Sequence, residues 1–466
     1  MKKELISKQN LLKYGKNSVI GIQHLFAMMG ATILVPTLTN MSIGMALLGS
    51  GIGTLIFYFI TKKKVPVYLG SSFAFLAAFM ASIPSSSEAA IGSDLWNTAM
   101  GKVAVAVFCA GTVYLLFALL VKVIGYKNIK KIFPPIVVGP VIIVIGMCLA
   151  PVTFNNLTGS VTSLISSGET KTFSYFATWL PALVTALTII GVGCFAKGFF
   201  KVIPILCGIL AGYITAAIFG VVNFSIVKDA HWILFEPSAL SENFGWYKDI
   251  SFNWTVIMTF VPIAIVTFME HLGDINASSV VCGKDFFKDP GVHRTLMGDG
   301  IATMAAGLIG APCNTTYGEN TAVLAITKNY NPNLLALAAV FAIVLGIFTK
   351  FGGIIGSIPT SVIAGASMLL YGMIAANGLK TMVEAKLDFS DTKNMIIASA
   401  ILVVGIGMNS AGQTLLIKDI EFSPLAVATI VGIVLNLILN VFTGFKKAES
   451  GLSATGNDYP DEKISK

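Results

Sequence analysis

Long apolar runs constrain the fold of this chain more than any other feature. Such runs recur from residue 17 to residue 444, and many approach the length of about 20 residues that a helix needs to cross a bilayer. Only 12% of the residues are charged, against about 25% in ordinary soluble domains. Because a spanning segment has to satisfy its own backbone hydrogen bonds, these runs predict helices. The sequence therefore predicts an all-α polytopic membrane protein.

We expect about fourteen membrane segments from these runs. They are placed at 17–38, 43–61, 66–84, 98–124, 134–151, 177–196, 199–220, 254–277, 293–311, 313–328, 333–350, 354–376, 391–409 and 423–444. The third segment, 66–84, and the tenth, 313–328, are short and carry Gly, Ser, Thr and Asn within the apolar pattern. We expect these two segments to be interrupted rather than plain helices.

The distribution of lysine predicts the orientation in the membrane. Every second loop is basic, with lysines before residue 17, at 62–64, at 122–131 and at 197–201, whereas the loops between them are acidic or mixed. By the positive-inside rule, both termini are expected on the cytoplasmic side of the cell membrane. The net charge of +8 is attributed to lysines that face anionic lipid, so nucleic acid is not expected as a partner.

The sequence carries no familiar signature of a metal site, a disulfide framework or an enzyme. The six cysteines lie scattered in or beside apolar runs, and no pair has CxxC spacing. The HExxH, GxSxG and GxxxxGK(S/T) motifs are absent. We therefore expect that the chain is not an enzyme and that it binds neither a metal nor another cofactor.

Acidic side chains within the apolar pattern point to a transport pathway. Glu270 and Asp274 follow the apolar run 256–269, and Glu319 lies in the polar stretch 314–320 of the tenth segment. A carboxylate at membrane depth costs about 2.5–3.5 kcal/mol, so such a group usually faces a cavity, a substrate or a proton path. Glu270 and Asp274 are four residues apart and share one helix face. The alternative is a polar contact between helices that binds no ligand.

Short matches between the two halves of the chain predict an internal repeat. Gln23-His24-Leu25 corresponds to Glu270-His271-Leu272, and the interrupted stretch 68–73 corresponds to 314–319. The proline-led starts of the fifth and twelfth segments, 134–139 and 359–365, match as well. Seven segments in each half give the second half inverted topology, as in many transporters. The fold is therefore expected to be a 7+7 inverted repeat.

Several further residues near these stretches are weaker candidates. His24 and His271 are expected mainly as hydrogen-bonded packing residues, and Asp299 as a structural or a coupling residue. Phe73 would be a packing aromatic in most membrane proteins, but beside an interrupted stretch the alternative is that it stacks on a flat ring. Tyr371 is expected mainly as a packing residue.

These motifs together resemble the nucleobase–ascorbate transporter family, also called the nucleobase:cation symporter-2 family, and within it the uracil permeases. The stretches that carry the resemblance are Gln23–Met28 with Gly30–Thr32, Tyr68–Phe75, Glu270–Gly273, and Asn314–Asn320 continuing to Lys328. The resemblance covers nearly the whole chain. It implies a secondary transporter that imports uracil with protons and acts as a homodimer; sodium stays open as the coupling ion.

The resemblance also implies a division into a core domain and a gate domain, with short antiparallel strands in segments three and ten. The expected ranges are a cytoplasmic N-terminal segment (1–16), the core domain (17–124 and 254–350), the gate domain (125–220 and 351–444), an extracellular loop (221–253) and a cytoplasmic tail (445–466). The loop is expected to fold as a cap, and the tail to be disordered.

The family's binding residues carry over onto named positions of this chain. The resemblance implies that Phe73, Glu270, Tyr317, Gly318 and Glu319 bind the substrate, with Tyr371 facing them from the gate domain. A coupling or supporting role is expected for Asp274, His271, Asn320, Asp299 and His24.

One position departs from the uracil permeases, which have histidine where this chain has Asp274. Aspartate there is frequent in family members that carry xanthine or urate, but these tend to have glutamine in place of Glu319. A xanthine symporter on the same scaffold is therefore the alternative function. An anion transporter of related fold and a passive channel also stay open, although two site carboxylates disfavour both.

Movement between the two domains is expected at prolines and small residues. Pro134, Pro135 and Pro359 open two gate segments and remove backbone hydrogen bonds there. Gly139, Gly365 and Gly372 are expected to keep the sliding surface between the domains smooth.

Overall fold

The computed structural model describes residues 2–125, 134–159, 162–164, 170–172, 175–417 and 420–443. The chain is mostly helical, as predicted. The first half contains α1 (Lys2–Leu38), α2 (Ile43–Ile60), α3 (Leu76–Ser82), α4 (Asp94–Ile124), α6 (Pro135–Gly159), α7 (Tyr175–Phe195) and α8 (Pro204–Ile218). The second half contains α11 (Trp254–Cys282), α12 (Val292–Ile309), α13 (Gly318–Thr327), α14 (Pro332–Ile347), α15 (Thr349–Gly356), α16 (Thr360–Glu384), α17 (Thr392–Ser410) and α18 (Pro424–Thr443).

The remaining elements are short. The strands are β1 (Leu69–Ser71), β2 (Thr162–Leu164), β3 (Thr170–Thr172), β4 (Asn314–Thr316), β5 (Leu415–Ile417) and β6 (Ile420–Phe422). The 3-10 turns are η1 (Phe73–Phe75), η2 (Gly198–Val202) and η3 (Gly245–Asp249), and the π turn is η4 (Phe287–Gly291). Helices α9 (Ser225–Asp229) and α10 (Pro237–Phe244) lie between the two halves.

Each of the fourteen expected segments has a counterpart among these elements. By length and composition alone, 8 helices of the described chain are able to cross a membrane, or up to 9 if α14 and α15 form one span. The other segments are shorter, more polar or broken: Phe73–Ser82, Pro204–Ile218 and Pro424–Leu439 are short apolar helices, and α12 carries Asp299 and Arg294. The expected start of the twelfth segment at residue 354 is wrong, because α16 begins at Thr360 and α15 is bent 80° away from α14.

The expected strands in segments three and ten are confirmed. β1 and β4 form a two-stranded antiparallel sheet, so the strand of one half pairs with the strand of the other. Each strand leads into a short helix: β1 into η1 and α3, and β4 into α13. This correspondence agrees with a 7+7 organisation in which the two halves run in opposite directions.

The long helices pack in two groups. In one group α12 packs against α4 and α2, α14 against α2 and α1, and α11 against α4 and α13. In the other group α16 packs against α6 and α7, α7 against α8, and α17 against α18 and α6. The assignment of the first group to a core domain and of the second to a gate domain stays a prediction. That one group moves against the other stays a prediction.

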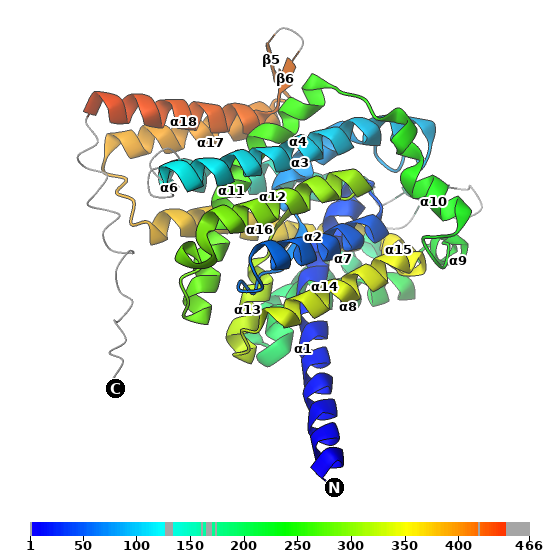
Figure 1. Ribbon diagram of the computed structural model, residues 1–466. Helices are drawn as coiled ribbons and strands as arrows, with labels where there is room; N and C mark the ends of the chain where they lie inside the picture. The colour runs from blue at the N-terminus through cyan, green and yellow to red at the C-terminus, as the bar shows by residue number, and fades with distance from the viewer. Residues whose placement is uncertain are drawn as a thin grey trace.

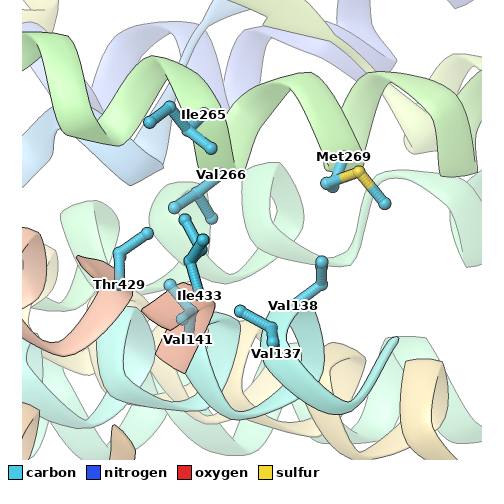
Figure 2. Close-up of a pocket in the computed structure, with 8 residues that line it drawn as sticks. All are labelled: Val137, Val138, Val141, Ile265, Val266, Met269, Thr429 and Ile433. Atoms are coloured by element: carbon cyan, nitrogen blue, oxygen red, sulfur yellow. The ribbon is translucent and has the colours of Figure 1, made fainter. Parts of the chain in front are cut away.

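The two groups meet where α11 faces α6 and α18. A small hollow at this contact is lined by Val137, Val138, Val141, Ile265, Val266, Met269, Thr429 and Ile433 (Figure 2). Nearly all of these side chains are apolar, and Met269 directly precedes Glu270 in α11. The contact surface beside the candidate site is therefore apolar.

The predicted role of Gly139 and Gly365 as sliding residues is wrong. A Cβ added at Gly139 would lie 2.3 Å from the Met382 side chain of α16, and one at Gly365 would lie 2.3 Å from the Ala182 carbonyl oxygen of α7. Both glycines thus allow close packing inside one helix group. Gly372 differs, because nothing lies within 4 Å of its added Cβ.

Residues 221–253 contain α9, α10 and η3 and form a folded cap. Helices α9 and α10 lie together with α15 at one end of the helix bundle (Figure 1). η3 packs on α4, and α9 packs on α15. Of the two terminal ranges, the expected N-terminal segment is helical from Lys2 as part of α1, and the expected tail at 445–466 lies outside the described residues.

Candidate functional site

The centre of the candidate site is the backbone crossing of β1 and β4. Leu69 pairs with Thr316, Gly70 with Thr315 and Ser71 with Asn314. Beyond the strands, the Ser72 N–H donates to the Cys313 carbonyl at 2.9 Å, and the Tyr317 N–H donates to the Tyr68 carbonyl at 3.0 Å. All residues of both strands are buried. The crossing therefore satisfies the backbone of two interrupted segments without lipid or water.

Tyr317 fastens this crossing with its side chain. Its hydroxyl donates to the Ser71 carbonyl at 2.8 Å and accepts from Thr32 Oγ1 at 3.1 Å. The residue is only 4% exposed. The ring lies against Gly70, where an added Cβ would be 2.5 Å from the ring carbon Cζ, so only glycine fits beneath it. The structure thus places Tyr317, expected to bind substrate, with its side chain inside the strand crossing.

Hydroxyl and amide side chains from the surrounding helices hold the two strands. Thr54 Oγ1 donates to the Leu69 carbonyl at 3.1 Å and accepts from the Leu69 N–H at 2.9 Å. The Asn314 side-chain amide donates to the carbonyls of Gly49 at 3.3 Å and Ala302 at 3.1 Å. β1 and β4 are therefore fixed to α2 and α12 by polar contacts inside the first helix group.

Three carboxylates gather at the open side of the crossing. Glu270 is exposed, whereas Asp274 and Glu319 are half-buried. Glu319 lies in the first turn of α13, where the positive end of the helix favours a negative charge. Gly273 and Gly318 are exposed, and nothing lies within 4 Å of a Cβ added at Gly273. Glu270 and Gly318 are thus accessible, and Glu319 partly so, near the start of α13.

Asp274 joins α11 to this crossing. Thr316 Oγ1 donates to Asp274 Oδ2 at 2.5 Å. The second carboxylate oxygen, Oδ1, lies 3.7 Å from the position of a Cβ added at Gly318. One carboxylate oxygen of Asp274 thus accepts a hydrogen bond from β4, and the other lies near the start of α13.

His271 lies next to Glu270 in the chain but faces the opposite way. Its Nδ1 is 2.8 Å from Asp299 Oδ2, its Nε2 is 3.0 Å from Thr295 Oγ1, and both His271 and Asp299 are fully buried. Because Thr295 Oγ1 donates to the Val292 carbonyl at 3.0 Å, it accepts from Nε2. These two contacts fix α11 on α12.

His24 and Asn320 form a second buried pair. The Asn320 amide donates to the His24 carbonyl at 2.9 Å and to His24 Nδ1 at 3.2 Å. Among the described residues, His24 Nε2 and Asn320 Oδ1 have no hydrogen-bond partner. The pair ties the first turn of α13 to α1 and does not border the open side.

The two candidate aromatics lie on different helix groups. Phe73 is half-buried at the start of η1 and packs against the two largest hydrophobic clusters. Tyr371 lies on α16 and is 1% exposed, and its hydroxyl has no hydrogen-bond partner among the described residues.

Sequence reasoning missed the side chains that hold the site together. Thr32, Thr54, Thr295 and Thr316 all bond a site residue or a strand of the crossing. A hydroxyl inside an apolar segment was the available signal, but threonines are too frequent in this chain for that signal to select four of them. No group of three or more metal-ligating side chains occurs within the ranges that the structure describes.

The sequence matches known permeases over nearly its whole length. The model of the "Permease family" matches residues 15–413. The uracil permease of Bacillus caldolyticus is 42% identical over 442 residues, which cover 94% of this chain and 95% of that protein. The uracil permease of Escherichia coli K12 is 36% identical over 443 residues, covering 95% and 96% respectively.

Solved transporter structures share the fold at low sequence identity. The transmembrane domain of a cyanobacterial bicarbonate transporter, BicA, aligns with a TM-score of 0.54 at 14% identity and covers 91% of this chain and 97% of that one. Murine Solute Carrier 26 family member A9, an anion transporter in the inward-facing state, aligns with a TM-score of 0.62 at 11% identity and covers 91% and 68% respectively. At this identity the likeness shows the 7+7 fold alone.

Proposed function

The chain belongs to the nucleobase–ascorbate transporter family of permeases, and we propose that it imports uracil across the cell membrane by proton symport. The family membership makes the chain a transporter and not an enzyme. The observation that carries the choice of substrate is that α11, which bears the exposed Glu270, is bonded through Asp274 to β4, three residues before Glu319 in the first turn of α13. The names of the relatives support the same choice.

The chemistry of uracil suits this arrangement. The flat ring offers N–H donors and carbonyl acceptors along its edge. Glu270 and Glu319 accept from the ring N–H groups, and backbone N–H groups near Phe73 and Gly318 donate to the carbonyls. Each charge-assisted bond is worth roughly 1.5–3 kcal/mol. Phe73 covers one face of the ring, Tyr317 holds the backbone in place, and Tyr371 faces the substrate from the gate domain.

Uracil is neutral near pH 7, so its accumulation requires a coupling ion. We assign this role to a proton taken up at Asp274, whose Oδ1 lies beside Gly318 and one helix turn from Glu270. Protonation there changes the charge next to the substrate carboxylates and so links uptake to the proton gradient. His271 with Asp299, and His24 with Asn320, support the site from the buried side. Sodium is the alternative ion.

The two helix groups supply the movement. The group that carries β1, β4, α11 and α13 acts as the core domain, and the group of α6, α7, α8, α16, α17 and α18 acts as the gate domain. Their apolar contact at α11, α6 and α18 supports sliding, because apolar side chains exchange partners without breaking hydrogen bonds. Two such chains form the homodimer, embedded in lipid with both termini in the cytoplasm.

Uptake by a strain that lacks its own pyrimidine carrier tests this proposal. Cells that express the chain should accumulate radiolabelled uracil, more so at acid pH, and an uncoupler should abolish accumulation. Excess unlabelled uracil should compete and excess xanthine should not. Competition by xanthine alone would assign the chain to purine transport, for which Asp274 is the favouring residue. Accumulation that follows the sodium gradient instead of the pH would overturn the proton coupling.

A further inference from the structure

The cap exposes an unusual amount of apolar surface between α8 and α10. Within residues 224–235, Phe224 is 58% exposed, Trp232 66% and Phe235 65%, and Ile226 and Ile233 are exposed as well. We call this set of side chains the apolar cap face. A loop in water rarely keeps several large apolar side chains in contact with solvent. Some other environment therefore covers this face.

The polar groups of the same segment are satisfied on its inner side. Thr349 Oγ1 donates to the His231 carbonyl at 2.7 Å, and Lys350 Nζ donates to the carbonyls of Lys228 and Ala230, both at 2.9 Å. The Leu234 N–H donates to the Ile347 carbonyl at 2.9 Å. Much of the backbone hydrogen bonding of residues 228–234 is thus made to α14 and α15.

The backbone N–H groups of the turn around Trp232 are also satisfied. Glu236 Oε1 accepts from the Trp232 N–H at 3.1 Å and the Ile233 N–H at 3.2 Å, and Glu236 Oε2 is 3.0 Å from His231 Nδ1. A backbone with so few open hydrogen-bonding groups is able to lie against lipid, where unpaired groups are costly.

The position of α15 fixes the depth of this segment. α14 is one of the expected spans, and α15 turns 80° from it, so α15 lies across the end of the bundle rather than along the membrane normal. α9 packs directly on α15, and a Cβ added at Gly353 would lie 2.6 Å from Cβ of Ala230, the residue that follows α9. Figure 1 shows α9, α10 and α15 together at this end. The apolar cap face therefore lies at the level where the spans leave the bilayer.

We infer that the apolar cap face is inserted in the interfacial layer of the lipid bilayer and anchors the cap there. Aromatic side chains accompanied by lysine are typical of this layer. Lys350 Nζ lies 5.2 Å from the centre of the Trp232 ring, and Lys228, whose carbonyl accepts from Lys350 Nζ, is exposed. The face adjoins the exposed apolar surface of α7 and α8, because Phe219, which follows α8, is exposed and packs edge-on against exposed Phe176 of α7. Lipid is favoured over a protein partner for that reason.

Quenching of tryptophan fluorescence in reconstituted vesicles tests the inference. The full-length protein and the Trp232→Phe variant are placed in phosphatidylcholine vesicles that carry bromine either near the headgroup or near the bilayer centre. The fluorescence that Trp232→Phe removes should be quenched by bromine near the headgroup and hardly by aqueous iodide. Trp179→Phe is the matched control, because Trp179 is an exposed tryptophan of the spanning helix α7. Phe235→Trp should add a component with the same quenching, so the test does not depend on one variant.

Quenching of the Trp232 component by iodide and not by bromolipid would overturn the inference. Protection from both quenchers would also overturn it, because it would assign the apolar cap face to a contact between two copies of the chain. Neither result bears on uracil transport, since no residue of this face borders the candidate site.

Discussion

Thr316 on β4 donates a hydrogen bond to Asp274 on α11 at 2.5 Å, and this bond joins the strand crossing to the helix that carries Glu270. The two residues belong to different segments, and each is otherwise held by its own element. The bond therefore sets the distance between the start of α13 and the face of α11 that carries Glu270. Changes at either residue should alter the substrate site without unfolding the helices.

Replacement of Thr316 by valine should weaken uracil binding while leaving the fold intact. Valine keeps the shape of threonine but removes the hydroxyl, so the Asp274 carboxylate loses a donor worth roughly 1.5–3 kcal/mol. We expect uracil affinity of the purified protein, measured calorimetrically, to fall about tenfold, which corresponds to about 1.4 kcal/mol. Thr316→Ser retains the donor and serves as the control. Equal affinity of the valine and serine variants would show that the bond does not shape the site.

Replacement of Glu319 by alanine should lower uracil affinity more than tenfold. The change removes an acceptor for a ring N–H and the negative charge at the start of α13. Glu384→Ala is the matched control, because Glu384 is an exposed glutamate at the end of α16. Near-normal binding by purified Glu319→Ala protein would remove Glu319 from the substrate site.

Replacement of Asp274 by asparagine should separate exchange from accumulation. Asparagine still accepts a hydrogen bond from Thr316, so the site keeps its shape, but it takes up no proton. We expect vesicles with Asp274→Asn to exchange labelled for unlabelled uracil at near-normal rates and to show no accumulation driven by a pH gradient. Wild-type accumulation by this variant would assign the coupling proton to another group.

Replacement of Gly70 by alanine should destabilise the protein. The added methyl group would lie 2.5 Å from the Tyr317 ring and 2.7 Å from Thr32 Oγ1. The Tyr317 ring would therefore have to move, and its hydrogen bond to the Ser71 carbonyl would break. Overpacking of this kind costs about 1–3 kcal/mol. Gly372→Ala is the control, since its methyl group meets nothing within 4 Å. Thermal unfolding in detergent measures the difference in stability between the two variants. Equal transition temperatures would contradict a stabilising role for the packing of Tyr317 against Gly70.

The cap should lose stability in acid because of Glu236. Hydrogen bonds from the Ile233 N–H, the Trp232 N–H and His231 lower the pKa of Glu236 below its ordinary value. A lowered pKa in the folded state stabilises the cap at pH values above the unfolded pKa of about 4.3, and this stabilisation is lost as the pH falls through the folded pKa. Proteolysis of the cap from pH 7 to pH 3 should therefore show a loss of protection below about pH 4. Glu236→Gln, which does not ionise, should lack this step; an identical profile would exclude Glu236 as its origin.

The order and number of the segments were predictable because each apolar run had to match the bilayer thickness. The interruptions at 66–84 and 313–328 were predictable for the same reason, since polar residues there broke an otherwise apolar run. The packing of Gly139 and Gly365 was not predictable, because a small residue looks the same in sequence whether it faces its own group or the opposite one. The bend between α14 and α15 was not predictable either, because both helices are apolar and look like one continuous run in the sequence.

Within the candidate site, sequence identified the residue types but not their directions. Glu270 and His271 are adjacent in the chain, and only the pairing of His271 with Asp299 shows which of them is buried. The family resemblance implied that Tyr317 binds the substrate. Its hydroxyl instead bonds Ser71 across the crossing, a contact between residues 246 positions apart that no local pattern encodes.

The same separation bears on how the protein is made. β1 leaves the ribosome long before β4, and Tyr317 follows Ser71 by 246 positions. At about 5–20 residues per second, synthesis of the intervening chain takes on the order of 10–50 s. During that interval the hydrogen-bonding groups of β1 have no strand to pair with, although the segment already belongs in the membrane. The first half therefore requires a temporary partner, such as water or the insertion machinery, until the second half arrives.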